Sequence, residues 1–268
     1  MEIKSLQNEK IKLLKKAFDK KRTAKELNIF FIEGLKLFKD FFTSGNEYKY
    51  ILYSPSVLFS KDEIETIDML ENLEEDDNES VFRVPKSILN KFSTISGDQG
   101  VLVIAERFYL SLSDVITDKK DVIALAGIQD PGNFGTILRL AEGLGIGGII
   151  VSSDTVSEFN EKTVRASMGS ILNVPVYRSE NLVTTLTDLK KQGYIIAGTV
   201  LNDGENITEF TTDKPTVYIF GNEGSGIPDK IIDIVDKKLT IPLKGSVESF
   251  NVAISAALTL CQNNLKRG

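Results

Sequence analysis

The sequence predicts an α/β protein built from two parts, and three observations support this prediction. Short apolar runs with strand character alternate with amphipathic helical stretches along most of the 268 residues. In the second half, this alternation implies a mostly parallel sheet covered by helices on both faces. A polar stretch without a sustained hydrophobic period separates the two series at residues 107–120. We therefore expect an N-terminal domain at 1–106, a connector at 107–120 and a C-terminal domain at 121–268.

Residues 1–106 have the pattern of a small α/β unit that begins with a basic helix. Residues 5–22 place apolar side chains on one face and lysines on the other, as an amphipathic helix does. Pro85 suits the first turn of a later helix, because proline there loses no helical hydrogen bond. The expected strands are 29–32, 50–53, 81–84 and 100–106, and the further helices are 35–43, 56–73 and 85–92.

Residues 121–268 form the second series. The glycine-rich stretch 143–148 could suggest a dinucleotide-binding loop, but it follows an expected helix and precedes an expected strand. In that fingerprint the glycines follow a strand and open a helix, so we interpret them as a helix C-terminal cap. The expected strands are 122–126, 148–151, 174–177, 194–199, 217–220 and 239–241, and the expected helices are 133–144, 161–168, 182–192 and 250–264.

Composition indicates a cytoplasmic globular protein. Hydrophobic residues make up 41% and charged residues 26% of the chain, as in ordinary globular domains. No apolar run approaches the roughly 20 residues of a membrane span, and the N-terminus lacks the apolar core of a signal peptide. The single Cys261 excludes an intramolecular disulfide and a cysteine-cluster metal site. We expect neither a metal nor a membrane partner.

The chain contains no histidine. This excludes Ser-His-Asp triads, Cys-His pairs, histidine-ligated zinc and imidazole acid–base chemistry together. Catalysis must then depend on carboxylates, amides, hydroxyls, lysine, arginine or a cofactor.

Charge is unevenly distributed along the chain, whose net charge is −6. Residues 61–80 hold ten acidic residues and one lysine, whereas the first 25 residues hold nine basic and three acidic residues. A basic N-terminal segment is compatible with RNA binding, because phosphate contact depends on the local potential. A solvated amphipathic helix with ordinary surface lysines explains the composition as well, and the role of the acidic segment stays open.

Three segments have residues suited to a ligand. In 129–139, Asn133 stands where a helix N-cap is expected, and Arg139 lies on the same helix face as Gly135. This segment is compatible with simple capping and with a site at the end of a strand. In 219–228 a strand runs into three glycines with Asn222 and Glu223 among them, and such glycines expose backbone groups to a ligand. In 241–253 a strand ends at a proline, and a loop with serines and Asn251 leads into a helix of small residues.

Together these segments resemble the signature motifs of the SpoU/TrmH family of SPOUT methyltransferases, which methylate ribose 2′-hydroxyls in tRNA and rRNA. The matching elements are Asn133-x-Gly135-x-x-x-Arg139, Gly221-Asn-Glu223-Gly224-x-Gly226-Ile and Ile241-Pro-x-x-Gly245-Ser-x-x-Ser249-x-Asn251-Val-Ala. Phe31-Ile32-Glu33-Gly34 and Gln99-Gly100-Val101 resemble the family's ribosomal-protein-L30e-like RNA-binding domain. Asp98 stands where family members often have histidine.

The resemblance implies a C-terminal SPOUT domain with a deep trefoil knot, S-adenosylmethionine as cofactor, and a homodimer with its active site near the subunit interface. Knots are an exception among protein chains. The positions that match the family's cofactor contacts are Gly221, Ile241 and Phe250, with Leu243 and Thr199 as expected neighbours.

The resemblance also places Arg139 at the position of the family's proposed base. Arginine normally stays protonated, so we expect Arg139 to stabilise the developing alkoxide and bind phosphate. We expect Asn133, Glu223, Ser249 and Asn251 to position Arg139 and the ribose. The identity of the general base stays open.

We therefore expect methyl transfer to a ribose 2′-hydroxyl of structured RNA. The N-terminal domain favours rRNA, as in 23S rRNA, over tRNA. The alternatives are a tRNA 2′-O-methyltransferase and a non-catalytic RNA-binding or ribosome-assembly protein that retains the fold. A nucleotide-dependent oxidoreductase is disfavoured by the misplaced glycines.

Overall fold

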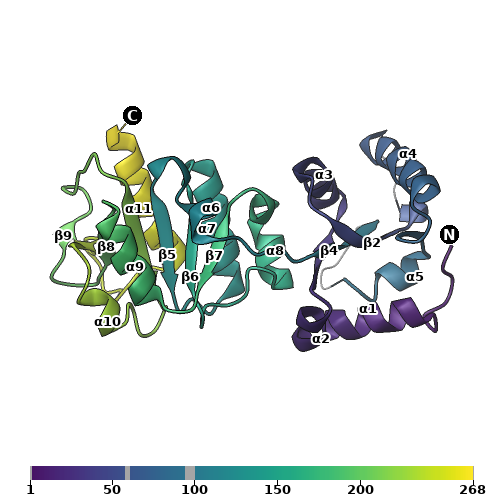
Figure 1. The fold of residues 1–268 in the computed structure, drawn as a ribbon, viewed down its shortest axis with the longest axis horizontal. Coiled ribbons are helices and arrows are strands. Elements are labelled where there is room, and N and C mark those ends of the chain that lie inside the picture. Colours follow the sequence, from purple (N-terminus) through teal and green to yellow (C-terminus); the bar gives the residue numbers. More distant parts are fainter. Residues whose placement is uncertain (1, 58–60, 94–99, 268) are drawn as a thin grey trace. The chain divides into compact units, whose positions relative to one another are not determined.

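The computed structural model describes residues 2–57, 61–93 and 100–267, which form two compact units (Figure 1). Unit 1 comprises Met1–Phe108 and Phe159–Arg165, and unit 2 comprises Tyr109–Glu158 and Ala166–Gly268. The segment 159–165 belongs to unit 1 because the Phe159 ring lies 4.9 Å from Phe30 and 5.3 Å from Phe108. Among the helices of the described part, none is long and apolar enough to cross a membrane.

Unit 1 is built on a four-stranded sheet with the order β1-β4-β2-β3. The pairs β1–β4 and β2–β4 are antiparallel, and the pair β2–β3 is parallel. The expected first helix at 5–22 is two helices, because Lys20 has extended backbone angles (φ −125°, ψ 103°) and Asn8 caps the first helix. The strands are β1 (Ile29–Glu33), β2 (Tyr48–Tyr53), β3 (Val81–Arg83) and β4 (Val101–Glu106), and the helices are α1 (Glu9–Asp19), α2 (Lys21–Glu26), α3 (Leu35–Ser44), η1 (Pro55–Val57), α4 (Lys61–Asp76) and α5 (Lys86–Leu89).

Helices α1 and α4 lie on opposite faces of this sheet. Leu52 of β2 packs in one core cluster with Ile11 and Leu14 of α1. The next residue, Tyr53, points to the other face, since side chains alternate along a strand, and its hydroxyl donates to Glu74 of α4. Burial and this hydrogen bond raise the pKa of Tyr53 to about 12. The sheet therefore separates a layer with α1 from a layer with α4 (Figure 1).

Unit 2 is built on a seven-stranded sheet with the order β7-β6-β5-β10-β8-β11-β9. Each pair of neighbouring strands is parallel, so the predicted parallel sheet is confirmed. The two-residue strand β9 and the short helix α10 were not predicted. The strands are β5 (Val122–Ala126), β6 (Gly148–Ser152), β7 (Val176–Ser179), β8 (Ile195–Thr199), β9 (Glu205–Asn206), β10 (Thr216–Gly221) and β11 (Lys237–Thr240).

Helices cover both faces of this sheet (Figure 1). On β10, Val217 and Ile219 pack in one cluster with residues of α6, α9 and α10, whereas α7 and α11 pack together on other contacts that include β6 and β10. The stretch 107–120 holds α6 and η2, and Val115 of α6 is fully buried in unit 2. The helices of this unit are α6 (Leu112–Val115), η2 (Thr117–Lys119), α7 (Pro131–Gly143), η3 (Ser170–Leu172), α9 (Leu182–Lys191), α10 (Asp229–Ile232) and α11 (Val252–Arg267), whereas α8 (Glu161–Ser167) belongs to unit 1 as far as Arg165.

The glycine-rich stretch after α7 caps that helix, as predicted. Gly145 has a left-handed backbone (φ 65°), its N–H donates to the carbonyl of Glu142, and the N–H of Ile146 donates to the carbonyl of Ala141. These two bonds define a Schellman motif.

Candidate active site

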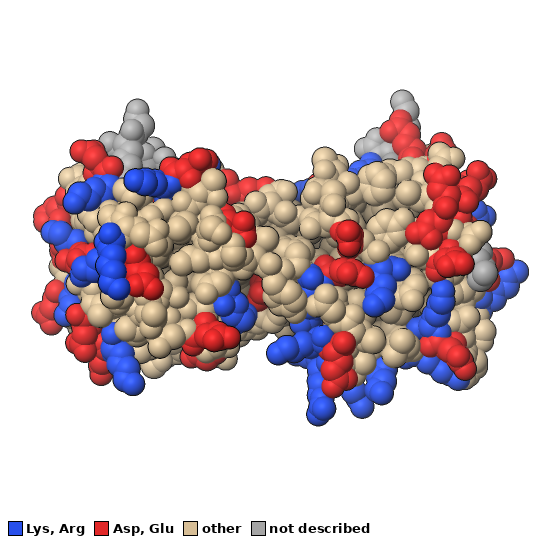
Figure 2. Space-filling view, viewed as in Figure 1, with Lys and Arg blue, Asp and Glu red and all other residues tan. Residues whose placement is uncertain are grey.

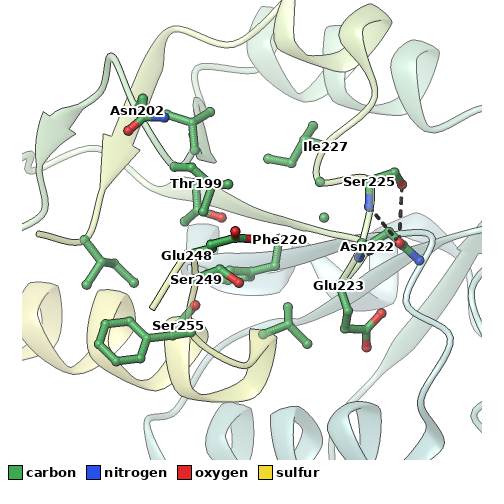
Figure 3. Close-up of a pocket in the computed structure, with 18 of the residues that line it drawn as sticks. Thr199, Asn202, Phe220, Asn222, Glu223, Ser225, Ile227, Glu248, Ser249 and Ser255 are labelled. Atoms are coloured by element: carbon green, nitrogen blue, oxygen red, sulfur yellow. Dashed lines mark hydrogen bonds between the residues drawn. The ribbon is translucent and has the colours of Figure 1, made fainter. Parts of the chain in front are cut away.

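The loops at the carboxyl ends of β8, β10 and β11 surround a cavity of about 560 Å³ (Figure 3). Because the strands are parallel, their carboxyl ends meet at one edge of the sheet, where ligands commonly bind in α/β folds. All five residues expected near the cofactor line this cavity. They are Thr199, Gly221, Ile241, Leu243 and Phe250.

Gly221 is required by a close backbone approach. The N–H of Asn222 donates to the carbonyl of Gly226 at 3.0 Å, and the N–H of Gly226 donates to the carbonyl of Asn222 at 2.9 Å. A Cβ atom on Gly221 would lie 2.2 Å from the backbone carbon of Gly226. The loop therefore folds tightly back onto the end of β10, and a side chain at position 221 would force it open.

Asn222 fixes this loop to the neighbouring strand end. Its side-chain N–H₂ donates to the carbonyl of Gly127 at 2.8 Å, and its Oδ1 accepts from the N–H groups of Gly224 and Ser225 at 2.9 and 3.0 Å. Asn222 lies in the second motif but is not among the expected catalytic or cofactor residues. Its signal in the sequence is an asparagine beside glycines, a type that often bonds to backbone N–H groups two residues on.

Three of the predicted catalytic residues form a chain of hydrogen bonds. Asn133 donates from Nδ2 to Glu223 Oε1 at 2.8 Å, and Asn251 donates from Nδ2 to Asn133 Oδ1 at 2.9 Å. Asn251 Oδ1 in turn accepts from the N–H of Ala253 at 2.9 Å, at the start of α11. Residues from α7, from the loop after β10 and from the entry to α11 are thereby held together, although they are far apart in the sequence.

The interpretation of Asn133 as an N-cap is wrong. Asp130 caps α7, because its Oδ1 accepts from the N–H of Asn133 at 2.9 Å. Proline at position 131 occupies the first turn, and the N-cap lies three residues before Asn133. The side chain of Asn133 is therefore available to Glu223 and Asn251.

Ser249 and Arg139 stand apart from this chain. Ser249 lines the cavity and is exposed. Arg139 is exposed on α7 and is not among the cavity-lining residues. Within the described part of the chain it makes neither a hydrogen bond nor an ion pair. Gly135 is buried in the same helix, so the two positions have different surroundings despite their spacing of four residues.

The cavity also has lining residues that sequence reasoning missed. Glu248 precedes Ser249 in the third motif, and the motif does not predict it because any residue is allowed at that position. Other polar side chains come from the loop after β8, from the loop after β10 and from α11; they are Asn202, Ser225 and Ser255.

Comparison with known proteins identifies the family. Residues 120–261 match the SpoU rRNA methylase family, which is more than half of the chain, and residues 8–103 match the MRM3-like substrate binding domain. The chain belongs to the SpoU rRNA methylase family. The family expected from the sequence motifs is thus confirmed.

Relatives and solved structures of this family extend over nearly the whole chain. The 23S rRNA (guanosine(2553)-2′-O)-methyltransferase RlmP of Bacillus subtilis is 32% identical over 257 residues, covering 96% of each chain. An S-adenosylmethionine-bound rRNA methyltransferase from Sinorhizobium meliloti has a TM-score of 0.88 at 27% identity, covering 100% of this chain and 98% of the other. The SpoU methyltransferase AviRb from Streptomyces viridochromogenes shares the fold, with a TM-score of 0.83 at 21% identity and coverage of 97% and 99%.

Proposed function

We propose that this chain transfers the methyl group of S-adenosylmethionine to a ribose 2′-hydroxyl of structured RNA, with 23S rRNA as the expected substrate. The observation that carries the proposal is the bonded chain Glu223–Asn133–Asn251, in which Glu223 also lines the cavity. Membership of the SpoU rRNA methylase family supports the reaction class, and the similarity to RlmP supports rRNA as the substrate.

The cavity fits the cofactor of this family. Its volume of about 560 Å³ lies in the range of small-molecule sites. S-adenosylmethionine supplies an already activated methyl group when it is bound. It would be held by backbone groups of Gly221 and Ile241 and by the side chains of Leu243, Phe250 and Thr199. From membership of the SpoU rRNA methylase family we also propose that the C-terminal segment is threaded as a deep trefoil knot.

We assign the polar residues to two roles, charge stabilisation and orientation of the ribose. We assign Arg139 to the developing negative charge on the ribose oxygen and to RNA phosphate, because a guanidinium stays protonated and donates several hydrogen bonds. Asn133, Glu223, Ser249 and Asn251 orient the ribose and Arg139. Polar groups held by hydrogen bonds, as in Asn133, Glu223 and Asn251, lower the barrier because they do not reorganise during the reaction.

A homodimer would bring Arg139 of one copy to the active site of the other. Ile254 and Leu258 lie four residues apart on α11 and are 51% and 41% exposed, so they form an apolar strip on one helix face. Phe250, just before α11, is 38% exposed. A second copy of the chain would cover this strip, and the exposed Arg139 would serve a site that two copies complete.

Unit 1 is the proposed RNA-binding domain, and its α1–α2 layer has the charge for it. Figure 2 shows basic side chains along α1 and α2 and acidic side chains over α4. Because the sheet separates these layers, an RNA backbone would approach the α1–α2 layer and be repelled from the other. Five exposed lysines on this layer make no ion pair with any described residue; they are Lys12, Lys16, Lys20, Lys21 and Lys25.

We propose the same division along the chain as the sequence predicts: an L30e-like RNA-binding domain at 1–106, a connector at 107–120 and a SPOUT domain at 121–268, in a cytoplasmic enzyme. The match of residues 8–103 to a substrate binding domain supports the first assignment. The expected substrate contact around Asp98 and Gln99 lies outside the described residues.

The test is methyl transfer by the purified protein from labelled S-adenosylmethionine to ribosomal RNA and to tRNA. Nuclease digestion and mass analysis should find a 2′-O-methylated nucleoside in 23S rRNA. A methylated base, methylation of tRNA alone, or cofactor binding without transfer to any RNA would each contradict the proposal.

A further inference from the structure

The charged side chains that line the cavity are all acidic among the described residues. Of the described residues that surround it, Glu223 and Glu248 are acidic and none is lysine or arginine. A cavity whose charged side chains are all negative favours a cationic ligand group over its neutral counterpart, because the Coulomb energy between unit charges at a few ångströms is sizeable even near a protein surface.

The two carboxylates differ in what they contact. Glu223 accepts from Asn133 at 2.8 Å and extends away from the centre of the view in Figure 3. Glu248 is exposed, forms neither a hydrogen bond nor an ion pair with the described part of the chain, and is drawn among Thr199, Phe220 and Ser249 in that view. Glu223 is committed to the polar chain, so Glu248 is the carboxylate left to meet a ligand.

Glu248 is also placed by the chain itself. It lies three residues before Asn251, whose side chain bonds both to Asn133 and to the start of α11. It is followed by Ser249 and Phe250, which line the same cavity. Anchoring of Asn251 therefore keeps position 248 at the cavity without help from Glu248's own side chain.

We propose that Glu248 is the counter-ion for the positively charged sulfur of the cofactor and thereby makes the cavity select substrate cofactor over spent cofactor. This inference rests on the proposed function. S-adenosylmethionine carries a sulfonium charge. Methyl transfer leaves the S–CH₃ electron pair on sulfur, the hydroxyl oxygen gains the methyl group and loses its proton, and S-adenosylhomocysteine is neutral at sulfur.

Such a residue acts on ligand exchange and not on the chemical step. Methyl transfer disperses the sulfonium charge, so a nearby carboxylate stabilises the bound reactant at least as much as the transition state. Glu248 would therefore strengthen binding of S-adenosylmethionine and weaken product inhibition, while contributing no acceleration at saturating cofactor.

The experiment measures dissociation constants by calorimetry for S-adenosylmethionine, S-adenosylhomocysteine and sinefungin, whose amino group keeps a cation near the sulfur position. In Glu248→Gln, we expect affinity for the two cationic ligands to fall roughly three- to fivefold, and affinity for S-adenosylhomocysteine to stay within about twofold. Glu248→Asp should keep part of the preference. In wild type the preference should shrink with added salt, because salt screens exposed charges.

Glu209→Gln is the matched control, because it removes one exposed carboxylate of unit 2 outside the cavity lining. It should leave all three constants unchanged. An equal loss for charged and neutral ligands in Glu248→Gln would overturn the inference, as would no loss at all. Failure of the wild type to bind any of the three ligands would instead overturn the proposed function.

Discussion

Two groups of polar residues in the candidate site differ in what holds their side chains. Asn133, Glu223 and Asn251 are bonded to one another. Arg139 and Glu248 are exposed, and the described part of the chain offers them neither a hydrogen bond nor an ion pair. The side chains of the first group are held in one orientation before any ligand binds. The second has charges but no internal partner, which is the state expected of side chains whose partners are RNA and cofactor.

This difference separates positioning from charge recognition. A bonded amide or carboxylate keeps one orientation, so its contribution to catalysis is geometry. An unpaired charge contributes through the Coulomb interaction with a group that carries or develops charge. Substitutions in the two groups should therefore affect different measurements.

The largest effect is expected for Arg139→Ala. Removing the guanidinium takes away the charge that we assign to the developing alkoxide, so transfer should fall by roughly a hundred- to a thousandfold. Cofactor affinity should stay near the wild-type value, since Arg139 does not line the cavity. Single-turnover transfer and calorimetry on the same sample measure both. Wild-type turnover in this variant would remove Arg139 from the mechanism.

Asn133→Asp tests the bonded group. The new carboxylate would face Glu223, 2.8 Å from the present amide nitrogen, and would replace a hydrogen bond by like-charge repulsion. Transfer should fall by roughly a hundredfold and further than in Asn133→Ala. Equal rates in the two variants, measured under single-turnover conditions, would argue against a positioning role for the bond to Glu223.

Mixed dimers test whether the unpaired Arg139 serves a site completed by the second copy. Arg139→Ala and Leu243→Trp, which fills the cavity, should each be inactive alone. When the two are unfolded together and refolded, roughly a quarter of wild-type transfer should return, because mixed dimers then contain one complete site. Chains that stay inactive after mixing, with dimers verified by light scattering, would place Arg139 and the cavity of one chain in one site.

The lysines of the α1–α2 layer test charge recognition at a distance from the cavity. With Lys16, Lys20 and Lys21 all changed to alanine, RNA affinity should fall, and the slope of log K against log salt should decrease by roughly 0.7–0.9 for each RNA phosphate that is no longer neutralised. Changing Lys191, Lys230 and Lys238 of unit 2 to alanine gives the same net charge and should leave the slope nearly unchanged. Equal slopes in both triple variants would refute the assigned surface.

The smallest effect is expected for Asp130→Ala. It removes the N-cap acceptor of α7 and leaves the N–H of Asn133 without its present partner, which should cost about 1 kcal/mol of unfolding free energy. Urea unfolding measures this, and Asp130→Asn should recover most of the loss. A fall in the transfer rate under conditions where the variant stays folded would show that the cap also sets the orientation of Asn133.

Sequence reasoning predicted the parallel sheet of unit 2 because its strands are nearly continuous apolar runs, as in β5 and β10. It misplaced the start of α7, since Asp130 and Asn133 are both suitable caps and only Pro131 distinguishes them. It could not predict that residues 159–165 join unit 1, because that depends on contacts of the Phe159 ring with Phe30 and Phe108, which are distant in the sequence.

In the candidate site, too, local features were predicted from the sequence and features that depend on the tertiary fold were not. The motifs and their neighbours identified five residues that line the cavity, among them Gly221, whose identity is fixed by the close backbone approach of Gly226. Motif spacing does not reveal which polar side chain bonds to which. The pairing of Asn133 with Glu223 spans 90 residues and that with Asn251 spans 118, so it depends on the tertiary fold. The role of Asn222 as a tie to Gly127 was missed for this reason.

The most direct test of the central claim is a map of ribose methylation in ribosomal RNA from three strains: wild type, a deletion of this gene, and the deletion carrying Arg139→Ala. We predict that one 2′-O-methylated nucleotide of 23S rRNA disappears in the deletion and stays absent with Arg139→Ala, while the wild-type gene restores it. An unchanged ribose methylation pattern in the deletion, or full restoration by Arg139→Ala, would contradict the account.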